Sequence, residues 1–340
     1  MSWRASLGVM LLMACSAEGP KSEPAAPNEP GILIPAGFPA LVVPPDNAVT
    51  AERVALGRRL FYDERLSRSG EVSCASCHQQ AHAFADPEPL SRGVDGQLGT
   101  RNASALVNAG WSTSFFWHGG APSLELQAVA PIKNPVEMDT TLAAVAERLA
   151  ADADVSAEFA RAYADVPSES SITRALASFV RSLVSADSAY DRFLAGDESA
   201  LSESARRGEA LFNGERGECF HCHAGYNFTT NAFKNNGTRA DDPDPGRSEV
   251  TLRDSDFGKF KIPTLRNVAA SAPYMHDGAL ATLADVIDAY ASGGRGHPRT
   301  DPTIRPLELS DADKADLLAF LEALTDERFL SNPAFADPQL

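Results

Sequence analysis

Cysteine and basic side chains are scarce in this chain. Five of its 340 residues are cysteine, and 30 Lys and Arg stand against 46 Asp and Glu, which gives a formal net charge of −16. This balance argues against nucleic acid as a partner, because nucleic-acid-binding surfaces are rich in cations. It is consistent with a well-solvated surface or with a basic protein partner. The sequence also lacks repeat arrays, and it is long enough for two domains of roughly 100–200 residues each.

Long apolar runs are absent too, apart from a short one near the N-terminus. Leu7–Met13 follows a short basic stretch and is too short to span a bilayer. Leu12–Cys15 resembles a lipoprotein signal. We therefore expect residues 1–15 to be a lipoprotein-type signal peptide with lipid on Cys15, and simple secretion or an unprocessed anchor are the alternatives. Residues 16–47, rich in Pro, Glu, Ala and Ser, predict a flexible tether. Nothing else in the chain is expected to cross a membrane.

Four of the five cysteines fall in two copies of one motif. The copies are Cys74-Ala75-Ser76-Cys77-His78 and Cys219-Phe220-His221-Cys222-His223. Such a run attaches a c-type haem, because its two thiols add to the porphyrin vinyl groups and the adjacent imidazole ligates the iron. A zinc ribbon would place its second pair roughly 15–20 residues after the first, whereas these pairs lie in opposite halves of the chain. The motifs therefore predict two covalent haems, with zinc or redox dithiols as alternatives. Bacteria attach such haems outside the cytoplasm, so we expect a periplasmic protein that reaches the membrane only through a lipid anchor.

Each motif follows a predicted helix of the same design. One helix is expected to begin near Thr50 and the other near Ser202. Each carries a glycine, Gly57 or Gly208, at the same distance before a Leu-Phe pair, which indicates a duplicated unit. Each half closes on a predicted amphipathic helix, and these helices are Ile172–Val184 and Asp311–Leu324.

Helix, haem motif, irregular loop and closing helix is the order of a cytochrome c domain. We therefore predict a mainly α fold of two cytochrome c-like domains, each with one covalently bound c-type haem and long loops. The N-terminal domain is placed at residues 48–190 and the C-terminal domain at 191–330, with a hinge over 187–201.

Several further segments resemble one family, the bacterial di-haem cytochrome c peroxidases and their MauG-type relatives. The resemblance covers roughly residues 48–325. The segments that carry it are Arg101–Ala103, Phe115–Gln127, Pro131–Met138, Lys261–Asn267 and Ala272–Gly278. They stand in the family's order. The resemblance implies a peroxidatic haem in the N-terminal domain and an electron-transfer haem in the C-terminal domain.

The resemblance also implies three catalytic side chains. Glu137 corresponds to the family's acid–base group, which moves a proton between the two oxygens of peroxide. Gln127 corresponds to an amide that orients peroxide in the same pocket, and Trp117 to the tryptophan between the two haems. Taken without the family, Glu137 would be a carboxylate at a helix start, Gln127 a surface residue and Trp117 a core residue.

Two positions depart from the peroxidases that need reductive activation. Where those enzymes carry a histidine that blocks the peroxidatic iron, this chain has Val94, so the first haem is expected to be five-coordinate or water-bound. Where they carry a methionine that ligates the second iron, this chain has Tyr290, as the MauG-type branch does. A phenolate ligand stabilises Fe(III). Met275 is the alternative ligand on spacing alone, and a buried core tyrosine is the alternative role of Tyr290.

Two lesser features follow from the same resemblance. A calcium ion sits between the domains in this family, and its ligands would map to the side chain of Asn102 and the carbonyls of Ser271 and Pro273. His118-Gly119-Gly120 stands where the family reads Asp-Gly-Arg. The loss of that charge pair puts the local loop geometry in question.

The sequence thus predicts a di-haem c-type oxidoreductase. The first hypothesis is a peroxidase that reduces hydrogen peroxide with electrons from a small redox protein, a cytochrome c or a cupredoxin, without prior reduction. The second is a MauG-like oxidase that modifies a partner protein, and the third is a plain di-haem electron carrier. Val94 argues against the carrier, because a carrier would have both irons saturated. A homodimer would follow from the family.

Overall fold

The computed structural model describes residue 1 and residues 32–339. The predicted signal peptide, Cys15 and the first half of the predicted tether lie outside the described residues. The first half of the described chain holds α1 Ala51–Phe61, α2 Cys74–Cys77, α3 Leu124–Gln127, α4 Val129–Lys133, α5 Leu142–Ala150, α6 Ala153–Tyr163 and α7 Glu169–Ser182. The second half holds α8 Ala189–Leu194, α9 Glu203–Phe212, α10 Ser248–Thr251, α11 Leu283–Ala291, α12 Asp311–Glu322 and α13 Glu327–Ser331. Two antiparallel strands, β1 Phe233–Lys234 and β2 Phe260–Lys261, form the one sheet in this range. The prediction of a mainly α fold is confirmed.

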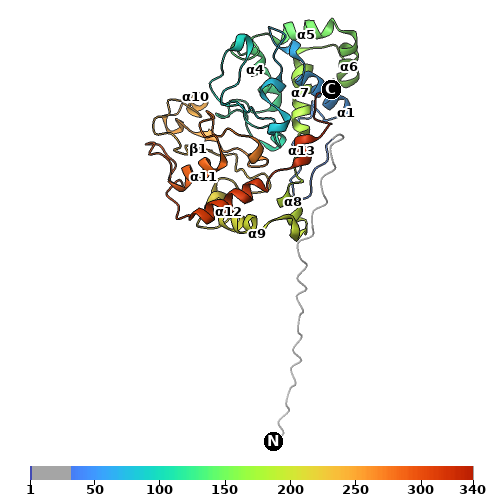
Figure 1. Ribbon diagram of the computed structural model, residues 1–340. Coiled ribbons are helices and arrows are strands. Elements are labelled where there is room, and N and C mark those ends of the chain that lie inside the picture. The colour runs from blue at the N-terminus through green and yellow to red at the C-terminus, as the bar shows by residue number, and fades with distance from the viewer. Residues whose placement is uncertain (2–31, 340) are drawn as a thin grey trace.

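Two helix pairs form the frame of the molecule. In Figure 1, α1 and α7 lie in the upper unit and α9 and α12 in the lower unit. A Cβ on Gly57 would lie 1.9 Å from the carbonyl oxygen of Ala175 in α7, and one on Gly208 would lie 1.9 Å from that of Asp316 in α12. Only glycine allows helices to cross this closely. The shared crossing supports the predicted duplication.

The helix starts follow the capping signals in the sequence. The hydroxyl of Thr50 accepts from Arg53 N at 3.3 Å, and that of Ser202 accepts from Ala205 N at 3.1 Å. Such caps satisfy amide groups that have no partner inside the helix. The closing helix α7 begins at Glu169 and ends at Ser182, so it starts earlier than the apolar pattern predicts. No helix in residues 32–339 is long and apolar enough to cross a membrane.

Residues 32–47 correct the prediction of a tether. Ile32 and Leu41 are buried and pack with Val49 in a small apolar cluster. The ring of Phe38 lies 5.2 Å from that of Trp111 and 4.7 Å from that of Tyr226. The tether prediction averaged composition over the whole segment and so missed these apolar anchors. A segment that buries them is part of the folded domain.

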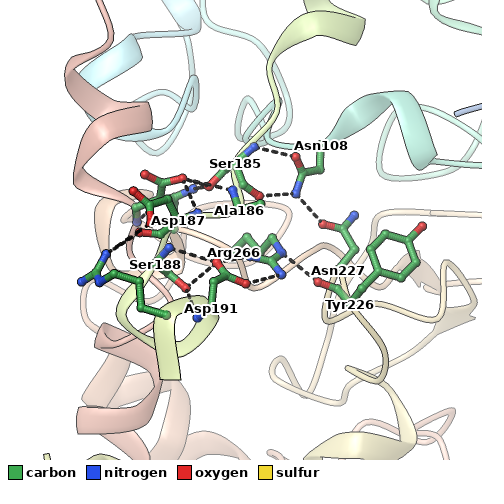
Figure 2. A network of polar contacts seen from close by, with 12 residues as sticks. Asn108, Ser185, Ala186, Asp187, Ser188, Asp191, Tyr226, Asn227 and Arg266 are labelled. Carbon is green, nitrogen blue, oxygen red and sulfur yellow. Dashed lines mark hydrogen bonds and ion pairs between the residues drawn. The ribbon is translucent and has the colours of Figure 1, made fainter. Parts of the chain in front are cut away.

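The connection between the units is fixed by buried polar contacts, not left free as the predicted hinge implies (Figure 2). Asn108 Nδ2 donates to Ser185 O at 3.0 Å, and Ser185 Oγ donates to Asp326 at 3.0 Å. Nη1 and Nη2 of Arg266 donate to Asp191 in α8, at 2.8 and 3.0 Å. Paired, buried groups of this kind hold a single geometry.

The end of the chain returns to the first unit. The ring of Phe329 in α13 lies 5.8 Å from that of Phe84, and Phe335 lies 5.5 Å from Phe329. Tyr62 Oη donates to the carbonyl oxygen of Phe335 at 2.7 Å. Although α13 follows the second unit in sequence, it completes the core of the first.

Candidate functional site

A cavity of about 880 Å³ lies between and within the two units. Its volume is in the range of cofactor and ligand sites. Both Cys-x-x-Cys-His motifs contribute to its wall. Glu137, Gln127, Trp117, Met275 and Tyr290 line it as well. The structure thus brings the predicted catalytic and haem-binding residues together around one cavity.

The first motif forms a short helix that ends at its histidine. Ser73 caps α2, whose two ends are Cys74 and Cys77. His78 follows, and its Nδ1 lies 2.7 Å from the carbonyl oxygen of Phe84. A hydrogen bond at Nδ1 fixes the ring and leaves Nε2 free to ligate a metal. Burial lowers the pKa of His78, which favours the neutral imidazole that ligation requires.

The second motif repeats this arrangement. Cys219 begins a single 3₁₀ turn, and His223 Nδ1 lies 3.1 Å from the carbonyl oxygen of Phe228. Burial lowers the pKa of His223 to about 4. Both histidine rings are therefore fixed at Nδ1 on the cavity wall, which leaves Nε2 as the nitrogen for an axial haem ligand. The residues fit a haem in each unit.

The four thiols are half-buried on the cavity wall, which bears on the alternatives to haem. Burial raises the pKa of Cys74 to about 12, of Cys77 to about 11 and of Cys219 to about 12. Redox dithiols react as thiolates, and such cysteines have lowered pKa values. A structural zinc ion needs four ligand side chains around it. Residues 32–339 also hold no cluster of three or more His, Cys, Asp or Glu side chains suited to a metal ion. The zinc and dithiol alternatives therefore lose support.

Glu137 lies in the first unit, in the loop after α4. Its Oε1 accepts from Asn134 Nδ2 at 2.5 Å. Burial raises the pKa of the Glu137 carboxyl, and the bond from Asn134 lowers it by less. The charge of Glu137 also raises the pKa values of Cys74 and Cys77, so the carboxylate lies near the first motif. A raised pKa makes a half-buried carboxyl better suited both to accept a proton and to return it.

The loop that carries Val94 is packed against the Glu137 segment. Val94 N donates to Glu137 O at 2.8 Å, and a Cβ on Gly93 would lie 2.1 Å from the carbonyl oxygen of Val136. The Val94 side chain is 1% exposed and does not line the cavity. Position 94 therefore offers the cavity neither a donor atom nor a side chain.

Tyr290 and Met275 lie together on the wall of the second unit. Asn236 Nδ2 lies 3.4 Å from Tyr290 Oη and 3.2 Å from Met275 Sδ. Burial raises the pKa of Tyr290 to about 12. Both predicted alternatives for the sixth ligand thus lie beside one amide. Sequence reasoning missed Asn236, because no motif marks it.

Trp117 is tied to both units. Its Nε1 donates to Asn102 O at 2.8 Å, and its carbonyl oxygen accepts from Lys261 N at 2.7 Å. Asn102 N in turn donates to His276 O at 2.7 Å. Trp117 therefore lies where backbone from the two halves meets.

The predicted calcium ligands also line the cavity. Asn102 Nδ2 donates to Glu88 O at 3.0 Å, which leaves its side-chain oxygen as the atom for a cation. Ser271 and Pro273 lie on the same wall. Their carbonyl oxygens are hard donors of the type that calcium prefers.

Comparison with known proteins bears directly on this arrangement. The family model described as di-haem cytochrome c peroxidase matches residues 51–199, and the cytochrome c model matches residues 205–325. The methylamine utilization protein MauG of Methylorubrum extorquens is 40% identical over 288 residues, which cover 84% of this chain and 81% of that protein. The chain belongs to the di-haem cytochrome c peroxidase and MauG family. Haem is therefore its cofactor.

Both branches of this family are represented among the similar proteins. The cytochrome c551 peroxidase of Pseudomonas aeruginosa is 32% identical over 290 residues, covering 82% of this chain and 80% of that protein. A crystal structure of a MauG-like protein associated with microbial copper homeostasis has a TM-score of 0.86 at 37% identity, covering 90% of this chain and 99% of that one. The chain is therefore an oxidoreductase of the peroxidase and MauG type.

The His118 loop departs from the family but keeps a defined geometry. Arg101 Nη1 lies 3.0 Å from His118 Nδ1, and Arg247 Nη1 donates to the carbonyl oxygens of His118 and Gly119 at 2.9 and 3.0 Å. Arg101 also pairs with Asp244 at 2.7 Å. Arginines from elsewhere in the chain thus replace the charge pair that the Asp-Gly-Arg sequence would supply within the loop.

Proposed function

We propose that the protein is a di-haem peroxidase that needs no prior reduction. Cys74 and Cys77 would bind one haem through thioether bonds and Cys219 and Cys222 the other, with His78 and His223 as the proximal ligands. Bound haem supplies an iron that coordinates peroxide and takes up its oxidising equivalents. The remaining chemistry belongs to the side chains of the cavity.

Glu137 supports this function more than any other residue. Its carboxyl lies near the first motif, burial raises its pKa, and Asn134 holds it in place. Glu137 would take the proton from the near oxygen of peroxide and return it to the far one, and the Gln127 amide would orient the substrate. Each peroxide consumes two protons and two electrons and yields two waters.

Electrons would come from a small redox protein, a cytochrome c or a cupredoxin, through the haem of the second unit. Tyr290 would be the sixth ligand there, and Trp117 would relay electrons between the units. The hydrogen bond from Trp117 to Asn102 and the position of Tyr290 on the cavity wall support these assignments.

The first experiment is to add stoichiometric hydrogen peroxide to the oxidised holoprotein without reductant. We expect the high-spin ferric EPR signal to vanish within seconds and to return with reduced cytochrome c. A signal that persists until one haem is reduced would mean that a residue blocks the first iron, and it would overturn the proposal.

A MauG-like oxidation of a partner protein is the second candidate. The 40% identity with a MauG protein and the tyrosine at position 290 favour it. It would use the same cavity, but the electrons would come from side chains of the partner. If peroxide-treated protein is reduced slowly by every small cytochrome and cupredoxin tested, and rapidly by a protein encoded beside it, this second function is the better one.

Three further assignments belong to the same proposal. Export to the periplasm with lipid on Cys15 is tested by palmitate labelling of the wild type and of Cys15→Ser. A homodimer is tested by the mass of the purified holoprotein in solution. Calcium held by Asn102, Ser271 and Pro273 is tested by metal analysis before and after chelation, with Asn102→Ala as the variant.

A further inference from the structure

Lys261 lies at the junction of the two units and is held from both ends. It belongs to β2, and its backbone N donates to Trp117 O at 2.7 Å. Its Nζ donates to Ser114 O at 2.9 Å and lies 5.8 Å from the centre of the Phe115 ring. The whole residue is therefore fixed against the segment that carries Trp117, and it lines the cavity.

Lys261 differs from the other cations on the cavity wall. Within residues 32–339, four Lys and Arg side chains line the cavity. Three have carboxylate partners: Arg101 with Asp244, Lys234 with Asp301 and Arg305 with Glu218. Lys261 has none among the described residues.

Nor does the cavity wall offer Lys261 a carboxylate that is still free. Three glutamates line the cavity. Glu218 pairs with Arg305, Glu249 pairs with Arg101, and Glu137 accepts from Asn134. A counter-charge for Lys261 must therefore come from what the cavity holds.

An ammonium half-buried on a cavity wall without a counter-charge is costly, so its position calls for a reason. Burial alone lowers the pKa of Lys261 to about 8. An ammonium group has three hydrogens to donate, and the one carbonyl partner, Ser114 O, uses one of them. Buried charges persist in proteins where they are paired. The indole nitrogen of Trp117 already donates to Asn102 O, whereas the Lys261 ammonium keeps two hydrogens that it can still donate.

We propose that Lys261 binds a carboxylate of the prosthetic group, a propionate side chain of one haem, at the junction beside Trp117. This site rests on the proposed binding of two haems. The ion pair would neutralise a negative charge close to the iron. Since a nearby negative charge favours Fe(III), Lys261 would raise the reduction potential of that haem.

The test is redox titration of both haems in the holoprotein of Lys261→Met, Lys261→Arg and the wild type. For Lys261→Met we expect the Fe(III)/Fe(II) equilibrium of one haem to shift about tenfold toward Fe(III), which is 59 mV for one electron. Lys261→Arg should shift it less than threefold, because the charge remains. Lys259→Met is the matched control, since Lys259 is two residues away, pairs with Asp256 at 3.1 Å and does not line the cavity. We expect no shift there.

If Lys261→Met takes up two haems and both potentials stay within twofold of the wild type, the proposal is wrong and Lys261 is only a structural tie to Ser114. If Lys261→Met does not assemble, a crystal structure of the wild-type holoprotein decides. A propionate oxygen about 2.7–3.2 Å from Nζ would support the site, and its absence would overturn it. Peroxidase turnover is measured separately, so a normal reaction with peroxide alongside unchanged potentials would reject the lysine site and leave the proposed function intact.

Discussion

The two units contain the same hairpin followed by a helix, and they differ at one decisive position. In the first, Phe115 pairs with Ala121, and Ser123 caps the helical segment. In the second, Tyr274 pairs with Leu280, and Thr282 caps α11. The register that aligns these two hairpins aligns Tyr290 with Pro131. The second unit thus presents a phenol where the first presents a ring with no donor atom.

Proline at this position also explains a difference in the helices. The segment in the second unit is one continuous helix, α11, whereas in the first it is divided at Ala128 into α3 and α4. Proline lacks the amide hydrogen that would bond to the carbonyl of Gln127, and it disfavours the preceding helical turn. The break falls directly after Gln127. One residue therefore replaces the phenol and interrupts the helix at the predicted catalytic glutamine.

The proximal sides, by contrast, are nearly identical. Each motif histidine bonds through Nδ1 to a phenylalanine carbonyl, Phe84 in one unit and Phe228 in the other. The duplicated fold has thus kept the way it holds the motif histidine and differs at the position of Tyr290 and Pro131. On the proposed function, that single difference separates the site that reacts from the site that transfers electrons.

Removal of the proton carrier should give the largest effect and confine it to the first unit. Glu137→Gln keeps the shape and loses the titrating group, so we expect kcat/KM for peroxide to fall by about 10²–10⁴. Steady-state kinetics with a reduced cytochrome c checks this. Glu147→Gln is the control, because Glu147 is exposed on α5, and it should leave kcat/KM unchanged. A loss below threefold in Glu137→Gln would remove this residue from the chemistry.

The helix crossings test whether the two units depend equally on their frame. Gly57→Ala and Gly208→Ala each place a methyl group 1.9 Å from a carbonyl oxygen. We expect either change to lower the free energy of unfolding by about 1–3 kcal/mol. Gly99→Ala is the control, because the nearest atom to its Cβ lies 3.8 Å away. Chemical denaturation monitored at each haem measures these losses. If the two units depend equally on their helix crossings, the two variants should lose the same free energy of unfolding.

Tyr290 and Met275 compete for one role, and separate substitutions distinguish them. Tyr290→Phe removes a ligand that stabilises Fe(III), so the Fe(III)/Fe(II) equilibrium of the second haem should shift toward Fe(II) by tenfold or more. Met275→Leu should then leave the low-spin spectrum and that equilibrium unchanged. The reverse outcome would make methionine the ligand. Potentiometry and EPR of the two variants decide the matter.

The smallest expected effect concerns pH and the two hairpins. The register that aligns the two hairpins aligns His118 with Asp277, and Asp277 pairs with Arg239 at 2.7 Å. Burial, and after it the charge of Arg101, lowers the pKa of His118 in the folded state. Arg247, Glu249 and Asp244 also face it. The unfolded chain therefore binds this proton more readily, and the free energy of unfolding should fall as pH drops below about 6.5.

Replacing His118 with the aspartate found at the aligned position of the second hairpin should move this pH dependence to lower pH. A carboxyl in His118→Asp would pair with Arg101, and that stability would be lost only below a pH of about 4. Denaturant unfolding of both proteins between pH 7.5 and 5.0 makes the comparison. A slope that is the same in His118→Asp and the wild type would show that other groups control the acid response.

Features that depend on side-chain spacing could be predicted from the sequence. The caps at Thr50 and Ser202, the glycines at the helix crossings and the haem motifs each have a local pattern. The carbonyls of Phe84 and Phe228 could not be foreseen, because backbone acceptors leave no residue signature. Lys261 formed part of a family segment, but its lack of a counter-charge is a property of three-dimensional neighbours. The anchors within residues 32–47 were hidden by the polar composition around them.

Because α13 packs on the first unit, the two cores can close only in a certain order during synthesis. Phe329 and Phe335 pack beside Phe84, whose carbonyl orients His78. The first unit leaves the ribosome first, but its core can be completed only after the second unit has been made. Phe329 and Phe335, which belong to that core, follow the second unit in sequence. A nascent chain can close the second core while the first still waits for α13. Premature termination near residue 326 would thus damage the site farthest from the stop.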